Sequence, residues 1–290
     1  MTNRLKCLCV LLLLCAPRFS AAGRGLFDYD DSRPLNVEEA GAEPADGLVV
    51  HDIRFNDVAD GPMRAYLVVP EGKGPFAAIL YVHWLGDPET SNRTQFLEEA
   101  KQMARKGVVG LLVEMPWSNQ YWYRSRKIEN DYDFSVRQVQ NLRRALDLLS
   151  RRPDVDRKRI ALVAHDFGAS FGAILIGVDS RLRCAVLMAG TPVLSDWFLL
   201  SATLEGPERH AYIARMGPLD PVNFVGKAKS VPILMQFATE DQYVPREKAE
   251  LFARAAADPK ELRWYQTGHP MNAQAAADRV LWLHQHLALN

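Results

Sequence analysis

The chain has 290 residues, of which 48% are hydrophobic and 24% are charged, and its formal net charge is zero. A chain of this length and composition can bury a substantial core as one large domain or two small ones. The balanced charge provides no basic field, and it therefore argues against binding to nucleic acid or to an anionic membrane surface.

Residues 1–22 have the pattern of a secretory signal peptide. Arg4 and Lys6 precede an apolar run from Leu8 to Ala16, and small residues close the segment. The apolar run is too short to span a bilayer comfortably. The pattern predicts a secreted or periplasmic protein with no membrane span after signal removal; a retained apolar tail is the alternative. Removal would leave Cys184 as the only cysteine, which excludes an internal disulfide or a zinc site.

The remaining chain divides into an N-terminal arm at 23–47 and one domain at 48–290. The arm is rich in Gly, Pro, Ala and acidic residues and shows little periodicity. In the domain, apolar runs typical of strands alternate with segments of helical spacing. Strands are predicted at 48–55, 63–70, 76–83, 108–115, 159–165, 183–190, 231–239 and 260–267, and helices at 91–107, 131–153, 168–178, 245–257 and 272–287.

Repeated strand–helix units of this kind predict an α/β fold with a mainly parallel, roughly eight-stranded sheet and helices on both faces. Active sites of such folds gather at the carboxyl edge of the sheet, where strands end and helices begin. Residues 191–229 are irregular, and they predict a short lid above this edge.

The stretch "VAHDFGAS" has the spacing of a nucleophile elbow, a sharp turn between a strand and a helix. Asp166 stands at its centre, where serine is usual, and the small residues Ala164, Gly168 and Ala169 flank it. Such a turn raises the central side chain above the sheet edge. It also points the backbone N–H of Phe167 at the reaction centre.

Two further candidates follow later strands. Asp241 comes after the strand at 231–239, and His269 comes after the strand at 260–267. The order of nucleophile, acid and histidine is that of an α/β-hydrolase triad. His269 is then the general base, and Asp241 orients it and stabilises the imidazolium. A second backbone N–H for an oxyanion hole is expected at Trp84 or Leu85, in "HWLGDP".

Aromatic residues near these strand ends are candidates for the substrate pocket. The loop "EMPWSNQYWYRSRK" follows a strand at the functional edge, and the predicted lid carries further aromatic side chains. They predict a pocket suited to an apolar or aromatic small molecule. The candidate pocket residues are Trp117, Trp122, Trp197, Phe198 and Tyr212.

Residues 48–289 resemble the α/β-hydrolase superfamily and, within it, the dienelactone hydrolase-like group. The matching segments are "YVHWLG", "VDRKRIALVAHDFGASFGA", "AVLMAG", "FATEDQYVP" and "WYQTGH". The resemblance implies a hydrolase of small carboxylic esters, lactones or related substrates that needs no metal and no organic cofactor. Asp166 departs from that group, which mostly uses cysteine or serine, and is similar to the aspartate of epoxide hydrolases and haloalkane dehalogenases.

An aspartate at the elbow leaves three chemical routes open. A carboxylate that attacks an sp³ carbon forms an alkyl ester on the enzyme, which water activated by His269 then hydrolyses. Attack on an ester carbonyl would form an anhydride, and in the third route Asp166 acts as a base for water. A further alternative is a catalytically silent binding protein on the same fold.

Overall fold

A computed structural model describes residues 25–86, 93–200, 202 and 204–289 of the chain. The predicted signal peptide lies outside the described residues. Within them, no helix combines the length and the apolar character that a bilayer span requires.

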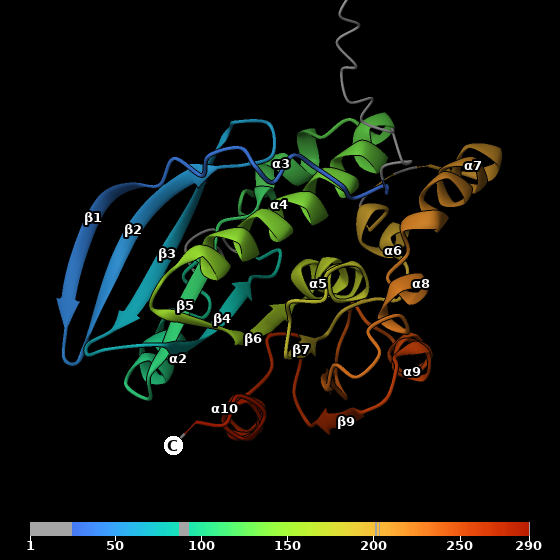
Figure 1. Ribbon diagram of the computed structural model, residues 1–290. Coiled ribbons are helices and arrows are strands. Elements are labelled where there is room, and N and C mark those ends of the chain that lie inside the picture. Colours follow the sequence, from blue (N-terminus) through green and yellow to red (C-terminus); the bar gives the residue numbers. More distant parts are fainter. Residues whose placement is uncertain (1–24, 87–92, 201, 203, 290) are drawn as a thin grey trace, which may run out of the picture.

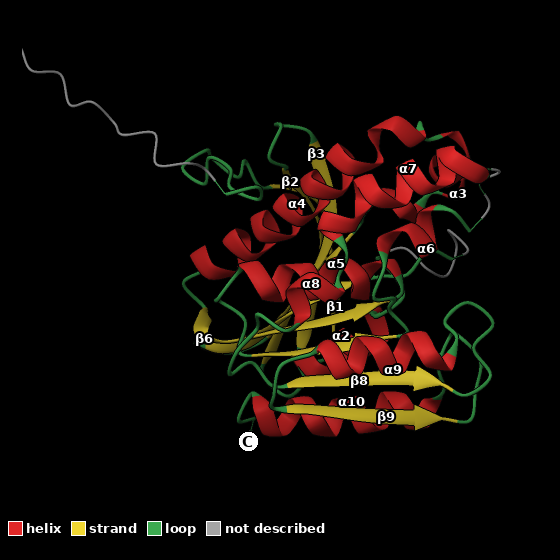
Figure 2. Ribbon diagram, turned by 90° about the vertical axis from the view of Figure 1, so that its right-hand side faces the viewer, coloured by secondary structure: helices red, strands yellow, loops and turns green. Residues whose placement is uncertain are grey.

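The chain forms a nine-stranded sheet in the order β1-β2-β3-β5-β4-β6-β7-β8-β9. Strands β1, β2, β3 and β5 pair antiparallel, and the pairs from β5 through β4 to β9 are parallel. The two last strands run side by side in the same direction (Figure 2). The bounds are β1 Glu38–Ala45, β2 Leu48–Asn56, β3 Pro62–Pro70, β4 Phe76–Val82, β5 Val108–Val113, β6 Val155–His165, β7 Cys184–Met188, β8 Ile233–Ala238 and β9 Lys260–Tyr265.

Helices cover both faces of this sheet (Figure 1). One face packs α4, α5, α8 and α9, and the other packs α2 and α10. Alternate residues of β4 serve the two faces: Leu80 and Val82 belong to the first core cluster, and Ile79 and Tyr81 to the second. The helix bounds are α2 Leu97–Ala104, α3 Gln120–Ser125, α4 Asp131–Arg151, α5 Phe167–Val178, α6 Leu194–Phe198, α7 Gly206–Met216, α8 Val222–Val225, α9 Arg246–Ala255 and α10 Ala273–His286.

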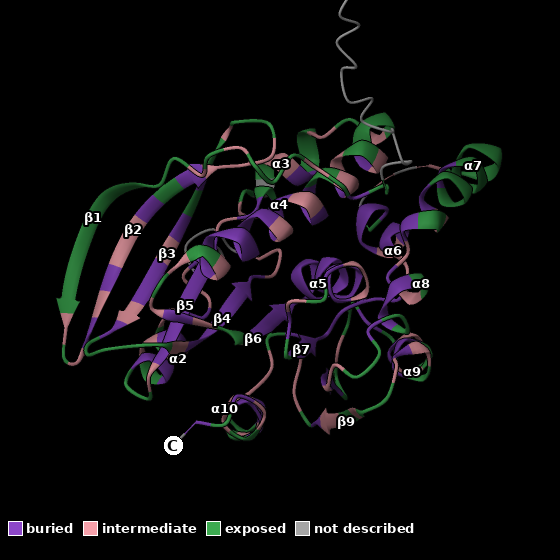
Figure 3. Cartoon of the chain, viewed as in Figure 1, coloured by how far each residue is buried: buried purple, intermediate pink, exposed green. Residues whose placement is uncertain are grey.

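The structure corrects the sequence prediction in the N-terminal arm. Residues 38–45 are not irregular but form strand β1, which pairs with β2 along its length. This additional edge strand gives the sheet nine strands rather than the eight predicted. Nearly every residue of β1 is exposed (Figure 3), so the strand lacks the alternation of apolar and polar residues that would have identified it. Residues 191–229, predicted to be irregular, instead contain α6, α7 and α8. These helices are short, so they show little of the periodicity that identifies a helix in the sequence.

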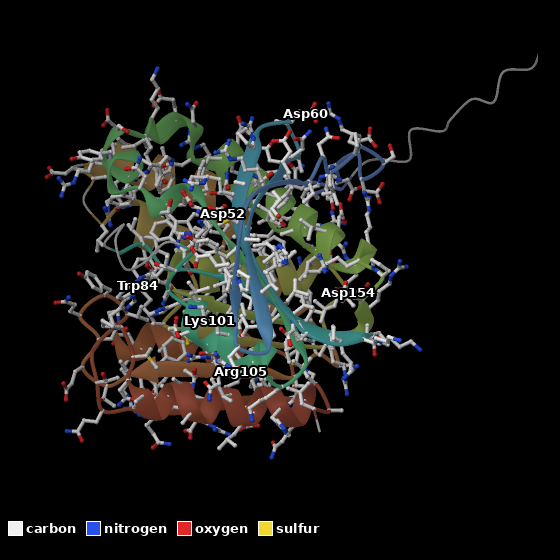
Figure 4. The ribbon with its side chains drawn as sticks, turned by 90° about the vertical axis from the view of Figure 1, so that its left-hand side faces the viewer. Asp52, Asp60, Trp84, Lys101, Arg105 and Asp154 are labelled. Carbon is white, nitrogen blue, oxygen red and sulfur yellow. The ribbon has the colours of Figure 1, made fainter. Side chains whose placement is uncertain are left out.

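Parallel pairing brings the carboxyl ends of the central strands to one edge. Val82 at the end of β4 is the partner of Ala164 in β6, and Met188 at the end of β7 is the partner of Gln236 in β8. Trp84 follows the end of β4, whereas Asp154 precedes the start of β6, and the two lie on opposite sides of the molecule (Figure 4). The residues that follow these strands therefore share one site.

Candidate active site

Asp166 occupies a strained turn between β6 and α5. Its φ of 58° and ψ of −115° lie in a region that non-glycine residues rarely adopt. The turn is crowded, because a Cβ added to Gly168 would lie 2.4 Å from the carbonyl oxygen of Val82. The Asp166 N–H donates to the carbonyl oxygen of Met188 at 2.9 Å, which fixes the turn to β7. Strain at a single aspartate that faces a cavity is typical of a functional position.

The two carboxylate oxygens of Asp166 have different surroundings. Oδ2 accepts a hydrogen bond from the Leu85 N–H at 2.8 Å, and the Phe167 N–H also favours the charged form. Oδ1 is buried and has no hydrogen-bond partner in the described structure. Burial raises the pKa of Asp166 to about 7, although the charge of His269 and the N–H of Leu85 act in the opposite direction.

His269 and Asp241 form a buried, hydrogen-bonded pair. The Nδ1–H of His269 donates to Asp241 Oδ2 at 2.8 Å, with Oδ1 at 3.1 Å. Asp241 Oδ1 also accepts from the N–H groups of Tyr243 and Val244. Burial acts to raise the pKa of Asp241, but these hydrogen bonds and the charge of His269 outweigh it, so the pKa lies below its ordinary value. Asp241 therefore remains charged and fixes the tautomer of His269.

The free nitrogen of His269 faces Asp166. Nε2 lies 4.0 Å from Asp166 Oδ2, which is beyond direct hydrogen-bond distance. Burial acts to lower the pKa of His269, but the hydrogen bond to Asp241 and the charge of Asp166 outweigh it, and the pKa is raised. A carboxylate needs no base to activate it, so this spacing suits a histidine that acts on a water molecule rather than on the nucleophile.

A cavity of about 360 Å³ opens above Asp166 and His269. Most of its surface is apolar, and the rings of Tyr243 and His269 pack edge to face, with 5.1 Å between their centroids. Leu200 and Tyr243 are exposed, so the cavity is accessible from solvent. The lining residues are Trp84, Leu85, Gly86, Asp166, Phe167, Trp197, Leu200, Gln242, Tyr243, His269 and Pro270.

The structure separates the predicted oxyanion donors. The N–H of Leu85 reaches the Asp166 carboxylate, whereas the N–H of Trp84 donates to Gln95 Oε1 at 2.9 Å. Trp84 is also a lining residue of the cavity, and its ring stacks on the His269 imidazole with 5.9 Å between the centroids. The backbone donors at Asp166 are thus those of Leu85 and Phe167.

Of the five aromatic residues predicted for the pocket, one, Trp197, lines the cavity. Its indole N–H donates to Ser170 Oγ at 2.9 Å, so its ring rather than its nitrogen serves the pocket. The other four lie outside the lining, because each is engaged behind it. Trp117 donates to the His83 carbonyl oxygen, Trp122 stacks on Phe134, Phe198 packs against Phe167, and the Tyr212 hydroxyl donates to Asp131.

Gln95 and His165 link three loops of the site. Gln95 Oε1 accepts from the Trp84 N–H, and its Nε2 donates to His165 Nδ1 at 2.7 Å. The Nε2–H of His165 then donates to the carbonyl oxygen of His269 at 3.1 Å. Burial holds the pKa of His165 well below its usual range, so the ring stays neutral and keeps this tautomer. We name this chain of bonds the Gln95–His165 clamp. Sequence reasoning missed Gln95, because no motif marks it.

Replacing Gln95 by Met tests the clamp. The variant keeps the side-chain volume but loses both hydrogen bonds, so Trp84 and His269 are less firmly placed. We expect kcat to fall about tenfold or more with little change in KM, because small misplacements of reacting groups are costly. Gln140→Met, far from the site on the exposed face of α4, is the matched control. Equal kcat values for the two variants would show that the clamp does not position the site.

Comparison with known proteins finds similarity between this chain and esterases. No family model matches the chain. The esterase FrsA of Escherichia fergusonii is 24% identical over 234 residues, which is 73% of this chain and 53% of that protein. The chain therefore spans about half the length of the curated relatives it matches.

Solved structures resemble the whole domain. Acetyl xylan esterase 1 from Thermoanaerobacterium superposes with a TM-score of 0.75 at 14% identity, covering 90% of this chain and 91% of that one. A candidate dienelactone hydrolase from Klebsiella pneumoniae gives a TM-score of 0.57 at 15% identity, covering 79% and 94%. The chain thus has the α/β-hydrolase fold that the sequence predicted.

Proposed function

We propose that the protein is a hydrolase of a small carboxylic ester, lactone or related electrophile, and that Asp166, His269 and Asp241 carry the reaction. The observation that carries the proposal is their arrangement. His269 donates to Asp241 through Nδ1 and faces Asp166 with Nε2. Asp166 and His269 both line one cavity. The similarity to esterases supports the same class of reaction.

We place a covalent intermediate on Asp166. In the first step Asp166 Oδ1 forms a bond to the electrophilic carbon, and the bond from that carbon to the leaving group breaks. A leaving oxygen takes a proton from protonated His269 or from water. In the second step neutral His269 takes a proton from water, which attacks Asp166 Cγ. The Cγ–Oδ1 bond then breaks, and Oδ1 leaves with the product as the oxygen of an alcohol or a carboxylate. The water oxygen stays on Cγ, and the new carboxyl group releases its proton to the departing alkoxide or to solvent, which restores the Asp166 carboxylate.

A second candidate is attack at an sp³ carbon, as in the cleavage of an epoxide or a haloalkane. The hydrogen bond from the Leu85 N–H to Asp166 Oδ2 favours it. In a serine esterase the N–H donors of the oxyanion hole bind the acyl oxygen of the substrate. Here the Leu85 N–H already donates to Oδ2 of Asp166, so this donor is not free for a substrate oxygen. After alkylation of Oδ1, the ester carbonyl would be Oδ2, and the same donors would stabilise the oxyanion that forms when water attacks Cγ.

A panel of uncharged aryl esters, lactones, epoxides and haloalkanes distinguishes these candidates. Turnover of esters or lactones by the wild-type chain supports the first, and turnover confined to epoxides or haloalkanes supports the second. Asp166→Asn is the matched control, since activity that survives in it does not come from this site. Binding of these compounds in the cavity without turnover of any class would instead support a binding protein.

A further inference from the structure

We infer that the cavity above Asp166 selects uncharged substrates and excludes anionic ones. This inference rests on the proposed function and specifies the charge of the substrates that the site accepts. Among the residues that the structure describes, eleven line the cavity, and they include Asp166 and His269 but no lysine or arginine.

The charges of the site sum to a negative value. Asp241 is charged, and Asp166 must be charged to act as a nucleophile, whereas His269 supplies at most one positive charge. The side chains of Asp166 and His269 are 3% and 5% exposed, so solvent screens them weakly. A carboxylate group on the substrate would therefore be repelled by the net negative charge of the site.

An anionic substrate also finds no cationic donor besides His269 among the described lining residues, where the exposed side-chain donors are the uncharged Gln242 amide and Tyr243 hydroxyl. The N–H groups of Leu85 and Phe167 already serve the Asp166 carboxylate. The indole N–H of Trp197 donates to Ser170, and that of Trp84 has no hydrogen-bond partner in the described structure but is buried away from solvent. Uncompensated burial of a charged group is costly, whereas the apolar rings of this lining suit a neutral molecule.

A bound anion would moreover weaken the nucleophile itself. A negative charge beside Asp166 favours protonation of its carboxyl, whose pKa already lies at about 7 because of burial. An anionic substrate should therefore react more slowly after binding. The pH below which kcat falls should also be higher for an anionic substrate than for a neutral one.

The test compares two substrates that differ in one charge. For esterase activity they are methyl 4-acetoxybenzoate and 4-acetoxybenzoate, and for epoxide hydrolysis they are methyl 4-oxiranylbenzoate and 4-oxiranylbenzoate. After subtraction of the uncatalysed rates, we expect kcat/KM for the methyl ester to exceed that for the carboxylate at least tenfold. Equal or faster turnover of the carboxylate would overturn the inference.

Substitutions at Leu200 separate charge from shape. Leu200 lines the cavity and is 53% exposed, so it can carry a longer polar side chain. Leu200→Lys places a cation at the rim and should reduce the neutral-to-anionic ratio at least threefold, whereas Leu200→Met should preserve it. Equal ratios in both variants would show that charge does not set the selectivity. Absence of turnover for every compound, neutral and anionic alike, would instead refute the proposed function, so the two failures are distinguishable.

Discussion

Asp166→Asn is expected to abolish turnover while making the folded protein more stable at pH 8. Asn keeps the shape of the side chain and can still accept the hydrogen bond from the Leu85 N–H, but it is not a nucleophile. Loss of a covalent nucleophile should lower kcat by at least about 10³-fold. Steady-state kinetics on any substrate that the wild-type chain turns over measures this loss.

The gain in stability should depend on pH in one direction. The folded pKa of Asp166 is about 7, above its ordinary value of 3.8, because the ionised carboxylate is buried. Below about pH 4 the carboxyl is protonated in both states, and wild type and variant should be equally stable. As pH rises from 4 to 7, the unfolded chain releases the proton first, and the wild type loses up to roughly 4 kcal/mol.

Chemical denaturation at pH 4 and pH 8 measures this difference. Asp258→Asn is the matched control, because its side chain is 87% exposed and should give no such change. A difference between wild type and Asp166→Asn that does not grow with pH would show that Asp166 is not held as an unfavourable buried charge.

His269→Gln should trap the covalent intermediate. Gln occupies similar space but is not a base, so attack by Asp166 proceeds whereas hydrolysis of the resulting ester stalls. We expect a burst of about one product equivalent per enzyme, a steady-state kcat at least about 10³-fold lower, and an increase in intact mass by the transferred group.

The double variant with Asp166→Asn is the control for this experiment, and it should show neither the burst nor the mass increase. A His269→Gln variant that is slow but never acquires mass, on a substrate that the wild type turns over, would contradict the two-step scheme.

The sequence predicted the central strands and the helices that pack on them, because their periodicity reflects burial on one or both faces. It also placed Asp166, Asp241 and His269 after three strands of one parallel sheet, and the structure brings these side chains together. The exposed edge strand β1 escaped prediction, since an edge strand with little apolar surface leaves no pattern.

The details of the site were harder to predict because they depend on loop conformation. Which of two consecutive N–H groups reaches Asp166 is decided by the turn at Trp84 and Leu85, and Gln95 accepts from the other one. Aromatic composition alone could not distinguish Trp197, on the cavity wall, from Tyr212, whose hydroxyl is held by Asp131.

A single turnover in heavy-oxygen water, with enzyme in excess over substrate, tests the covalent role of Asp166 most directly. If water attacks Cγ of the covalent intermediate, the label enters the Asp166 carboxylate, and mass spectrometry of the peptide that contains Asp166 detects it. We predict a labelled peptide and an unlabelled product from the first turnover. Label found only in the product would show that water attacks the substrate itself, and it would contradict the account.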